Sequence, residues 1–391
     1  MQSLSRTNTV DKGIKICSQG QMKALGTPGN NQTPKLYTLL HSPDNDDQSP
    51  QTSLDSKQDS KCFCRSHAER CQRNYLKSPK PTQNQRVEAP QYSKWGIGST
   101  QSLAEHLLHE EPCACAERCL AASDDEWFSE RFSDDVHPLL SLNNSKLSES
   151  IFKWWQTLQS TKSKANYTEV IQKLFSVVPG KDQYRDADSS RCRTCAVVGN
   201  SGNLLGSFYG PLIDNHDFVM RMNKAPVEGF EKDVGNKTTH RIMYPESAMH
   251  LDNDTHLVLL PFKLLDIQWM ASALSDGSIK RTRFKVIDKL QANKDKAMVM
   301  HPAFIYYVRS TWLHLRRSYP STGFLVLMFA LHICDEVSVF GFGANRKGTW
   351  HHYFENMPKK FKRTGQHPGG LEHQIILELQ KRNLIDLYTG W

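Results

Sequence analysis

The feature that most constrains the fold is the alternation of short apolar runs with longer helical patterns beyond residue 195. The runs predict buried strands at Ala196–Val198, Phe218–Met220, Leu257–Leu260 and Glu336–Phe340. The patterns between them predict helices, notably at Leu264–Leu274 and Ser321–Ile333. Strands that alternate with helices favour a mostly parallel sheet flanked by helices. We therefore expect an α/β fold whose ligands bind beyond the carboxyl ends of the strands.

Composition divides the chain near residue 110. Residues 1–110 are rich in Ser, Gln, Asn, Lys and Asp and contain few apolar clusters, so they cannot bury enough surface to offset the entropy of ordering. We expect a disordered low-complexity tail or stem there. Residues 111–391 contain seven of the eight Trp residues and are long enough for one α/β domain with a complete core.

Positive charge is concentrated in one part of the chain, whose overall net charge is +8. Ten Lys or Arg residues and only two acidic residues fall between Lys280 and Arg317. A solvated basic face explains this, and so does attraction of an anionic substrate or a membrane surface. Because no base-stacking or nucleic-acid motif accompanies the charge, we do not expect nucleic acid as a partner.

The cysteines indicate an oxidising compartment. Six of the ten fall in the part that we expect to fold: Cys113, Cys115, Cys119, Cys192, Cys195 and Cys334. An even set supports a disulfide framework, although the residues alone leave the pairing open and the close spacing of some of them also admits zinc. Four N-glycosylation acceptor patterns, which begin at Asn143, Asn166, Asn236 and Asn253, agree with a secretory lumen.

Neither a signal peptide nor a membrane span is apparent in the sequence. The longest apolar run, Phe324–Cys334, contains His332 and falls short of the ~18 residues that a span needs. We interpret this run as a buried helix.

Two glycine-containing segments are candidates for ligand binding. Gly199–Asn203 follows a predicted strand and is typical of either a tight turn or a loop that approaches a nucleotide closely. Tyr319–Gly323 precedes an apolar helix. There Ser321 or Thr322 is an ordinary helix cap, or the helix start holds a phosphate with its free N–H groups.

Two histidines are candidates for catalysis. His352 and His367 lie in polar, glycine-flanked segments of one basic region, and Glu372 follows His367 by five residues. A lone histidine is usually structural, but two in this setting favour acid–base chemistry.

Taken together, these segments resemble the motifs of the animal sialyltransferases. Four motifs of that family occur here in the family's order: the large motif in Cys192–Asn203 and Asp217–Pro226, the small motif in Tyr319–Gly323, Cys334–Val337 and Gly341–Gly343, the third in His352–Glu355, and the very small motif in His367 with Glu372. The resemblance covers about residues 110–391. The most similar subgroup is the β-galactoside α2,3-sialyltransferases that act on Galβ1-3GalNAc.

The resemblance implies a fold and a reaction. The fold would be the variant GT-A-like, Rossmann-related glycosyltransferase fold. His367 would be the general base that takes the proton from the galactose 3-hydroxyl, while His352 and Tyr319 would stabilise the departing phosphate. The donor would be CMP-sialic acid, and transfer would proceed with inversion and without a metal or other cofactor.

The resemblance also implies binding residues and disulfides. The donor would contact Asn200, Asn223, Tyr319, Ser321, Thr322, Gly323 and Gly343. The acceptor would contact Gln159 and Arg283, where the subgroup carries a tyrosine in place of Arg283. The disulfides would join Cys113 with Cys119, Cys115 with Cys192, and Cys195 with Cys334.

Acceptors and location follow from the same resemblance. Galactose-terminated glycoproteins or glycolipids would be the acceptors, and the enzyme would lie in the Golgi lumen as a single-pass type II membrane protein whose anchor is not visible in this sequence. One alternative is a catalytically silent relative that binds sugar or nucleotide, although both histidines are retained. Another is a cytosolic nucleotide-dependent oxidoreductase, against which the glycine spacing and the cysteines argue.

Overall fold

The computed structural model describes residues 125–158, 165–181, 183–186, 192–315, 318–355 and 367–390. The disordered tail predicted for residues 1–110 lies outside the described residues. So do Gln159 and the cysteines Cys113, Cys115 and Cys119, and what was predicted for them stays a prediction.

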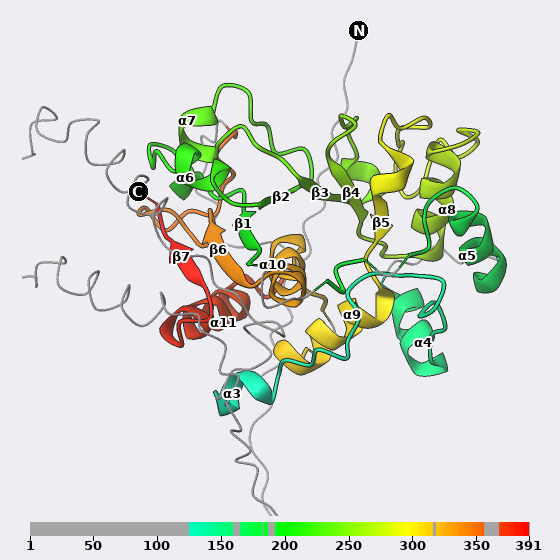
Figure 1. Ribbon diagram of the computed structural model, residues 1–391, viewed down its shortest axis with the longest axis horizontal. Coiled ribbons are helices and arrows are strands. Elements are labelled where there is room, and N and C mark those ends of the chain that lie inside the picture. Colours follow the sequence, from blue (N-terminus) through cyan, green and yellow to red (C-terminus); the bar gives the residue numbers. More distant parts are fainter. Residues whose placement is uncertain are drawn as a thin grey trace, which may run out of the picture. The chain divides into compact units, whose positions relative to one another are not determined.

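A seven-stranded parallel sheet runs through the described part of the chain (Figure 1). Its strands lie in the order β5-β4-β3-β2-β1-β6-β7. Their bounds are β1 Thr194–Val198, β2 Phe218–Met222, β3 His240–Met243, β4 His256–Leu259, β5 Ala297–Val299, β6 Glu336–Phe340 and β7 Asp386–Tyr388. From β1 the chain builds outward to β5 and then returns to β6 on the other side of β1. Strand order therefore reverses at the β1–β6 pair, the place where open sheets of this kind bind ligands.

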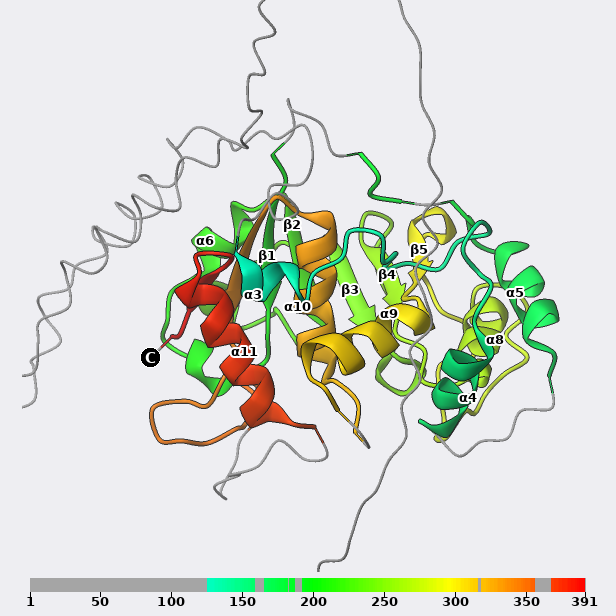
Figure 2. The ribbon, with the colours of Figure 1, turned by 90° about the horizontal axis from the view of Figure 1, so that it is seen from below.

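Helices cover both faces of the sheet. On one face α3 (Glu126–Ser129), α9 (Pro302–Tyr307), α10 (Thr322–Ile333) and α11 (Gly369–Lys381) share a core with the strands (Figure 2). On the other face lie α5 (Tyr167–Phe175) and α8 (Leu264–Ala273), and beside them α6 (Gly210–Asp214) and α7 (Glu231–Val234). Helix α4 (Glu149–Thr157) packs against α9 at the edge of the sheet and contributes Trp155 to the core around α5 and α8. The α/β architecture predicted from the alternating pattern is confirmed.

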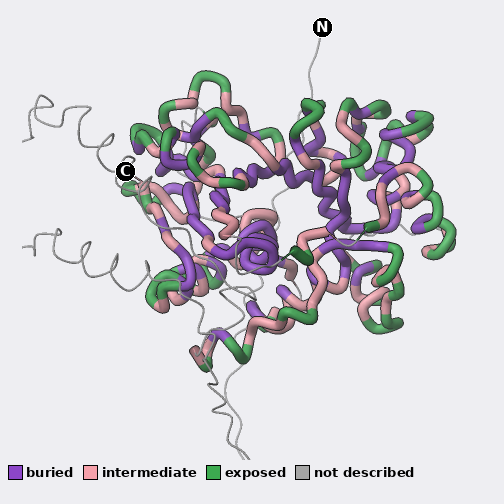
Figure 3. Tube along the Cα trace, viewed as in Figure 1, coloured by how far each residue is buried: buried purple, intermediate pink, exposed green. Residues whose placement is uncertain are grey.

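Helix α10 lies at the centre of the buried region (Figure 3). All of its residues from Phe324 to Ile333 are buried, which confirms the interpretation of this apolar run as a buried helix. Ser321 is its N-cap and accepts a hydrogen bond from the Phe324 N–H through its hydroxyl. Of the two predictions for Tyr319–Gly323, the ordinary cap is thus present, and the cap residue also faces the cavity described below.

Three strands were not predicted from the sequence. Strand β3 begins with His240 and Arg241, both buried, so it carries no continuous apolar run. Strands β5 and β7 have three residues each, too few for a periodic pattern. The boundaries of the predicted strands also shift: β1 and β2 extend to Thr194 and Met222, and β4 runs from His256 to Leu259.

Two observations bear on membranes and glycosylation. Among the described helices, none is both long and apolar enough to cross a bilayer. The four asparagines of the predicted glycosylation patterns, Asn143, Asn166, Asn236 and Asn253, are all exposed.

A disulfide joins the sheet to the central helix. Cys195 in β1 pairs with Cys334 at the end of α10, with a Cα–Cα distance of 6.1 Å and a separation of 139 residues along the chain. Both cysteines are fully buried. This pairing was predicted and is confirmed. Cys192 is disulfide-bonded as well.

We expect the single variants Cys195→Ala and Cys334→Ala each to lower the free energy of unfolding by about 3–5 kcal/mol, because the bond closes a long loop. The double variant is expected to lose about as much as either single variant, since one bond is lost in all three. Denaturant unfolding of the three variants measures this. Costs that add in the double variant would show that the two sulfurs contribute separately.

Candidate active site

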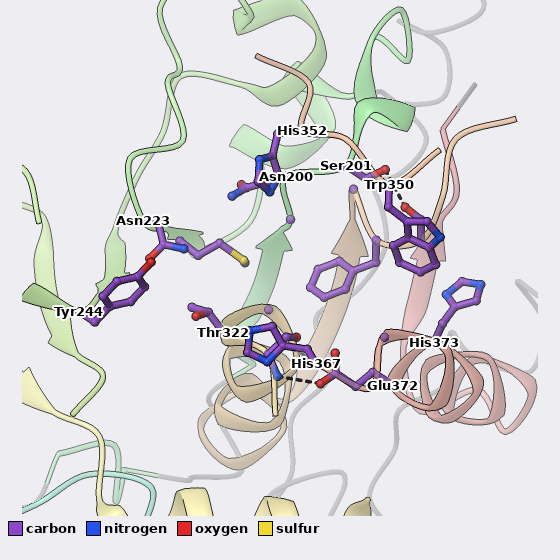
Figure 4. A pocket seen from close by; sticks show the side chains of 18 of the residues that line it. Asn200, Ser201, Asn223, Tyr244, Thr322, Trp350, His352, His367, Glu372 and His373 are labelled. Carbon is purple, nitrogen blue, oxygen red and sulfur yellow. Dashed lines mark hydrogen bonds between the residues drawn. The ribbon is translucent and has the colours of Figure 1, made fainter. Parts of the chain in front are cut away.

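One cavity of about 730 Å³ opens at the carboxyl ends of the strands. Residues that follow β1, β2, β3, β4 and β6 line it together with the first turns of α10 and α11 (Figure 4). It contains every described residue that was predicted to bind substrate or catalyse: Asn200, Asn223, Arg283, Tyr319, Ser321, Thr322, Gly323, Gly343, His352 and His367. The cavity thus brings together Asn200 and His367, which are 167 positions apart in the sequence.

The glycine loops after β1 and β6 are bonded to each other. The Gly199 N–H donates to the Phe340 carbonyl at 2.7 Å and the Ser201 N–H to the Gly341 carbonyl at 3.0 Å. A Cβ at position 199 would lie 2.3 Å from the Gly341 oxygen, so only glycine permits this approach. Glycine at 199 is therefore needed first to bring the two loops together, and the joined loops form the floor of the cavity.

Two asparagines present amide groups at this floor. The Oδ1 of Asn200 is buried and has no hydrogen-bond partner within the described part of the chain. The Oδ1 of Asn223 accepts from the Ser247 hydroxyl at 2.7 Å, and its backbone is in the left-handed region at φ 55°. Buried polar atoms normally have partners. A buried amide oxygen without a partner in a cavity therefore marks a position where a hydrogen-bond donor of a ligand is stabilised.

The N-terminus of α10 provides backbone donors. Ser321 occupies the cap, and the next two residues, Thr322 and Gly323, line the cavity. Among the described residues, nothing accepts a hydrogen bond from their N–H groups, as is usual in a first helical turn. Such donors, together with the helix dipole, suit a phosphate.

A buried carboxylate joins the two helix starts at the cavity. The Oε1 of Glu372, in the first turn of α11, accepts from the Ser321 N–H at 2.7 Å (Figure 4). Glu372 is only 6% exposed, and burial raises its pKa although the contact with Ser321 and the neighbouring His367 lower it. Glu372 therefore fixes where α10 begins relative to α11.

His367 lies beside Tyr319. Its Nδ1 donates to the Tyr319 carbonyl at 3.3 Å, and the two rings contact edge to face with centroids 5.2 Å apart. A carbonyl only accepts, so Nδ1 carries the proton in the neutral ring and Nε2 is the basic nitrogen. In this tautomer Nε2 is the ring nitrogen that can take a proton.

His352 is held differently. Its Nδ1 pairs with Glu355 Oε1 at 2.7 Å, and its backbone N–H donates to the other oxygen of the same carboxylate at 3.0 Å. Partial burial opposes ionisation of Glu355, but the hydrogen bonds from His352 outweigh it and lower the pKa of this carboxyl. The Glu355 carboxylate therefore fixes the orientation of the His352 ring at the cavity.

A buried ion network positions Arg283. The Oε1 of Glu246, which follows β3, accepts from the Thr282 hydroxyl and from the Arg283 N–H at 3.2 Å. The ammonium of Lys263 lies 3.5 Å from the same carboxylate and 2.7 Å from Asp266. Burial raises the pKa of Asp266 to about 6, against the attraction of Lys263. The segment that carries Arg283 is thereby tied to the end of β3.

Several residues of the cavity were not predicted from the sequence. Tyr244, Glu246, Phe262, Phe284 and His373 all line it. Tyr244 and Glu246 follow β3, and they were not predicted because that strand was not predicted. Figure 4 shows His373 beside Trp350 at the far end of the cavity from Tyr244. A prediction of α11 at Gly369–Lys381 would have placed His373 next to Glu372 at a helix start.

We expect Glu372→Gln and Glu372→Ala to have opposite effects on stability. The folded-state pKa of Glu372 is raised, so its contribution is complete at low pH and is lost as the pH rises through that value. Glu372→Gln retains an acceptor for Ser321, so its stability relative to the native chain is expected to increase from pH 4 to pH 8. Glu372→Ala is expected to lose about 1–3 kcal/mol, because the Ser321 N–H is left without its acceptor.

Denaturant unfolding across this pH range checks both variants. Glu169→Gln, an exposed first-turn glutamate of α5, is the matched control and is expected to change little. Equal losses in Glu372→Gln and Glu372→Ala at every pH would contradict the role of the acceptor.

Comparisons with known proteins identify the family. Residues 139–384 match glycosyltransferase family 29, described as the sialyltransferases. CMP-N-acetylneuraminate-beta-galactosamide-alpha-2,3-sialyltransferase 2 of Mus musculus is 47% identical over 298 residues, which is 75% of this chain and 85% of the mouse protein. The sialyltransferase 1 of the same name from Homo sapiens is 45% identical over 289 residues, 73% of this chain and 85% of the human protein.

A solved structure agrees with this. A mammalian sialyltransferase crystallised in complex with Gal-beta-1-3GalNAc-ortho-nitrophenol is 47% identical, superposes with a TM-score of 0.66, and covers 72% of this chain and 100% of its own. The family explains the order of the motifs, the parallel sheet and the cavity at its carboxyl edge. This chain belongs to glycosyltransferase family 29 and is a sialyltransferase.

Proposed function

We propose that this enzyme transfers sialic acid from CMP-sialic acid to the 3-hydroxyl of galactose in Galβ1-3GalNAc, with inversion at the anomeric carbon. The observation that carries the proposal is the meeting of His367, with its basic Nε2, and the phosphate-type donors of the α10 N-terminus in one cavity. The glycans that carry this disaccharide on glycoproteins or glycolipids are its proposed acceptors.

The donor would lie over the joined glycine loops. Asn200 and Asn223 offer amide groups for the nucleotide. Gly343, whose backbone is left-handed at φ 89°, would let the backbone of the loop after β6 approach it closely. The phosphate would sit at the N–H groups of Thr322 and Gly323. Ser321, whose hydroxyl caps the helix, would act by holding this turn in place.

The departing phosphate needs compensation of its growing negative charge. The His352 imidazole, held by Glu355, and the Tyr319 hydroxyl would supply it together with the helix dipole. These groups would take the part that a metal ion takes in other glycosyltransferases, so we propose that transfer is independent of metals and other cofactors.

Transfer to the acceptor would occur in a single displacement at the anomeric carbon. The Nε2 of His367 takes the proton of the galactose 3-hydroxyl as the oxygen forms its bond to the anomeric carbon of sialic acid. The bond from that carbon to the phosphate oxygen breaks, and its electron pair leaves with CMP. Attack and departure occur on opposite faces of the carbon, which gives inversion.

The acceptor preference is supported by relatives and by position. The mouse and human relatives are named for transfer to beta-galactosamide, and the mammalian neighbour was crystallised with a Gal-beta-1-3GalNAc compound. In this chain Arg283 lies at the wall of the cavity, where we propose that it contacts the acceptor. Gln159, outside the described residues, remains a second proposed contact.

The proposed location is the Golgi lumen, with a type II membrane anchor as in the family. The disulfide between Cys195 and Cys334 supports an oxidising compartment, because such bonds are rare in the cytosol.

A transfer assay tests the function. The full chain, made in a secretory host, is given CMP-sialic acid and either Galβ1-3GalNAc or Galβ1-4GlcNAc in the presence of EDTA. We expect sialylated product, with the first acceptor preferred. Binding of CMP with no product from either acceptor would instead identify a silent relative, and product only without EDTA would contradict metal independence.

We expect His367→Ala to reduce kcat by about 10²–10⁴-fold while CMP binds with unchanged affinity, because a general base contributes this much and does not hold the nucleotide. Steady-state kinetics and calorimetric CMP binding measure the two effects. Lys381→Ala, an exposed substitution on α11, serves as control. An equal loss of CMP binding and turnover would assign His367 to the donor site instead.

A further inference from the structure

A second hollow of about 410 Å³ adjoins the cavity. The two share Glu246, and Lys224 in the hollow directly follows Asn223 in the cavity. Asn223 and Tyr244 lie at one end of the cavity, opposite Trp350 and His373 (Figure 4). The hollow therefore continues the cavity at the end away from Trp350. We call it the basic groove, lined by Lys224, Pro245, Glu246, Ala248, His250 and residues 285–289.

The charges that face the basic groove are mostly positive. Lys224, Lys285 and Lys289 are exposed, and no carboxylate of the described residues lies within 4.0 Å of their ammonium groups. Of the two acidic residues, Glu246 is already engaged with Lys263 and Thr282. Asp288 lies 3.9 Å from Lys280 at the surface. Three uncompensated ammonium groups thus remain for an anionic partner.

The backbone that presents these lysines is held in place. The Thr282 N–H donates to the Phe284 carbonyl at 2.9 Å and the Val286 N–H to the Lys280 carbonyl at 3.1 Å. The Glu246 carboxylate ties this turn to the end of β3. The backbone that carries Lys285 therefore has a fixed position relative to the cavity, which limits the conformational entropy that binding costs.

The position of the groove indicates what occupies it. Arg283 and the exposed ring of Phe284 stand at the wall of the cavity, just before Lys285 in the groove. If the disaccharide fills the acceptor end of the cavity, the molecule that carries it leaves past these residues into the groove. Ammonium groups on two separate segments match carboxylates spaced along an extended polypeptide.

We propose that the basic groove binds acidic side chains of the polypeptide that bears the acceptor sugar, so that the enzyme prefers glycopeptides with Asp or Glu near the glycosylated residue. This inference rests on the proposed function for the direction in which the acceptor leaves the cavity. It assigns a role to the concentration of positive charge that follows Lys280 in the sequence.

Binding of two matched glycopeptides tests the proposal. Both carry Galβ1-3GalNAc on one threonine, and they differ only in having Glu or Gln at the flanking positions. We expect the native chain to bind the Glu peptide about five- to tenfold more tightly at low ionic strength, from several surface ion pairs, and this ratio to fall toward one in high salt. The probe is calorimetry, with kcat/KM measured alongside.

The groove variant Lys224→Gln/Lys285→Gln/Lys289→Gln is expected to lose the preference and to keep its rate on the free disaccharide. The matched control, Lys146→Gln/Lys173→Gln/Lys381→Gln, removes three exposed lysines outside both hollows and is expected to keep it. A ratio of one in the native chain, or an unchanged ratio in the groove variant, would overturn the proposal.

A third probe separates the source of the anion, and the readouts separate the two proposals. This probe is a Gln peptide with an additional sialic acid on the GalNAc. If it binds more tightly through the three lysines and the Glu peptide does not, the groove binds the negative charge of the glycan and the polypeptide proposal is wrong. Preferential binding without any transfer would overturn the proposed function alone. Transfer at equal rates to equally bound peptides would overturn the groove alone.

Discussion

The pairing of β1 with β6 is the constraint on which the site depends. Five residue pairs join the two strands, from Thr194 with Glu336 to Val198 with Phe340. Hydrogen bonds between the two glycine loops continue the pairing beyond the strands, and the disulfide of Cys195 with Cys334 fastens the end of α10 to β1. Because the strand order reverses here, the carboxyl edge opens into a cavity at this point. A side chain at position 199 or a broken disulfide would therefore disturb the floor of the site as well as the core.

A second constraint sets the other wall. Glu372 binds the Ser321 N–H across 51 residues, and His367 donates to the Tyr319 carbonyl across 48. Both contacts reach the short segment that leads into α10. The N–H groups proposed to bind the phosphate and the proposed base, His367, are thus positioned by the same few residues. Geometry of this kind matters because small misplacements of a catalytic group have large effects on rate.

Much of the fold and site was predictable from the sequence because it depends on local patterns. Apolar runs identified β1, β2, β4 and β6, and the resemblance to known motifs identified the residues around Asn200, Tyr319 and His367. Strand β3 was missed because its polar residues find partners only in the folded chain: Arg241 donates to the Ala225 carbonyl at 3.0 Å, and His240 pairs with the Tyr184 hydroxyl at 2.7 Å. No hydropathy pattern reveals such partners. Tyr244 and Glu246 were missed for the same reason.

The remaining features depend on contacts between distant segments. The role of Glu246, which joins Lys263 to the turn before Phe284, follows from three segments that meet only in the folded chain. The basic groove has the same origin, since Lys224 and Lys285 are 61 residues apart and share one hollow. The concentration of charge was visible in the sequence, but its position beside the acceptor end of the cavity was not.

We propose that one cavity aligns the phosphate, the anomeric carbon and the acceptor hydroxyl with His367. The most direct measurement is a crystal structure of the enzyme with CMP and Galβ1-3GalNAc bound together. We expect the phosphate at the N–H groups of Thr322 and Gly323, with the galactose 3-hydroxyl oxygen about 2.6–3.2 Å from His367 Nε2. A phosphate bound away from α10, or a 3-hydroxyl beyond hydrogen-bond reach of His367, would contradict it.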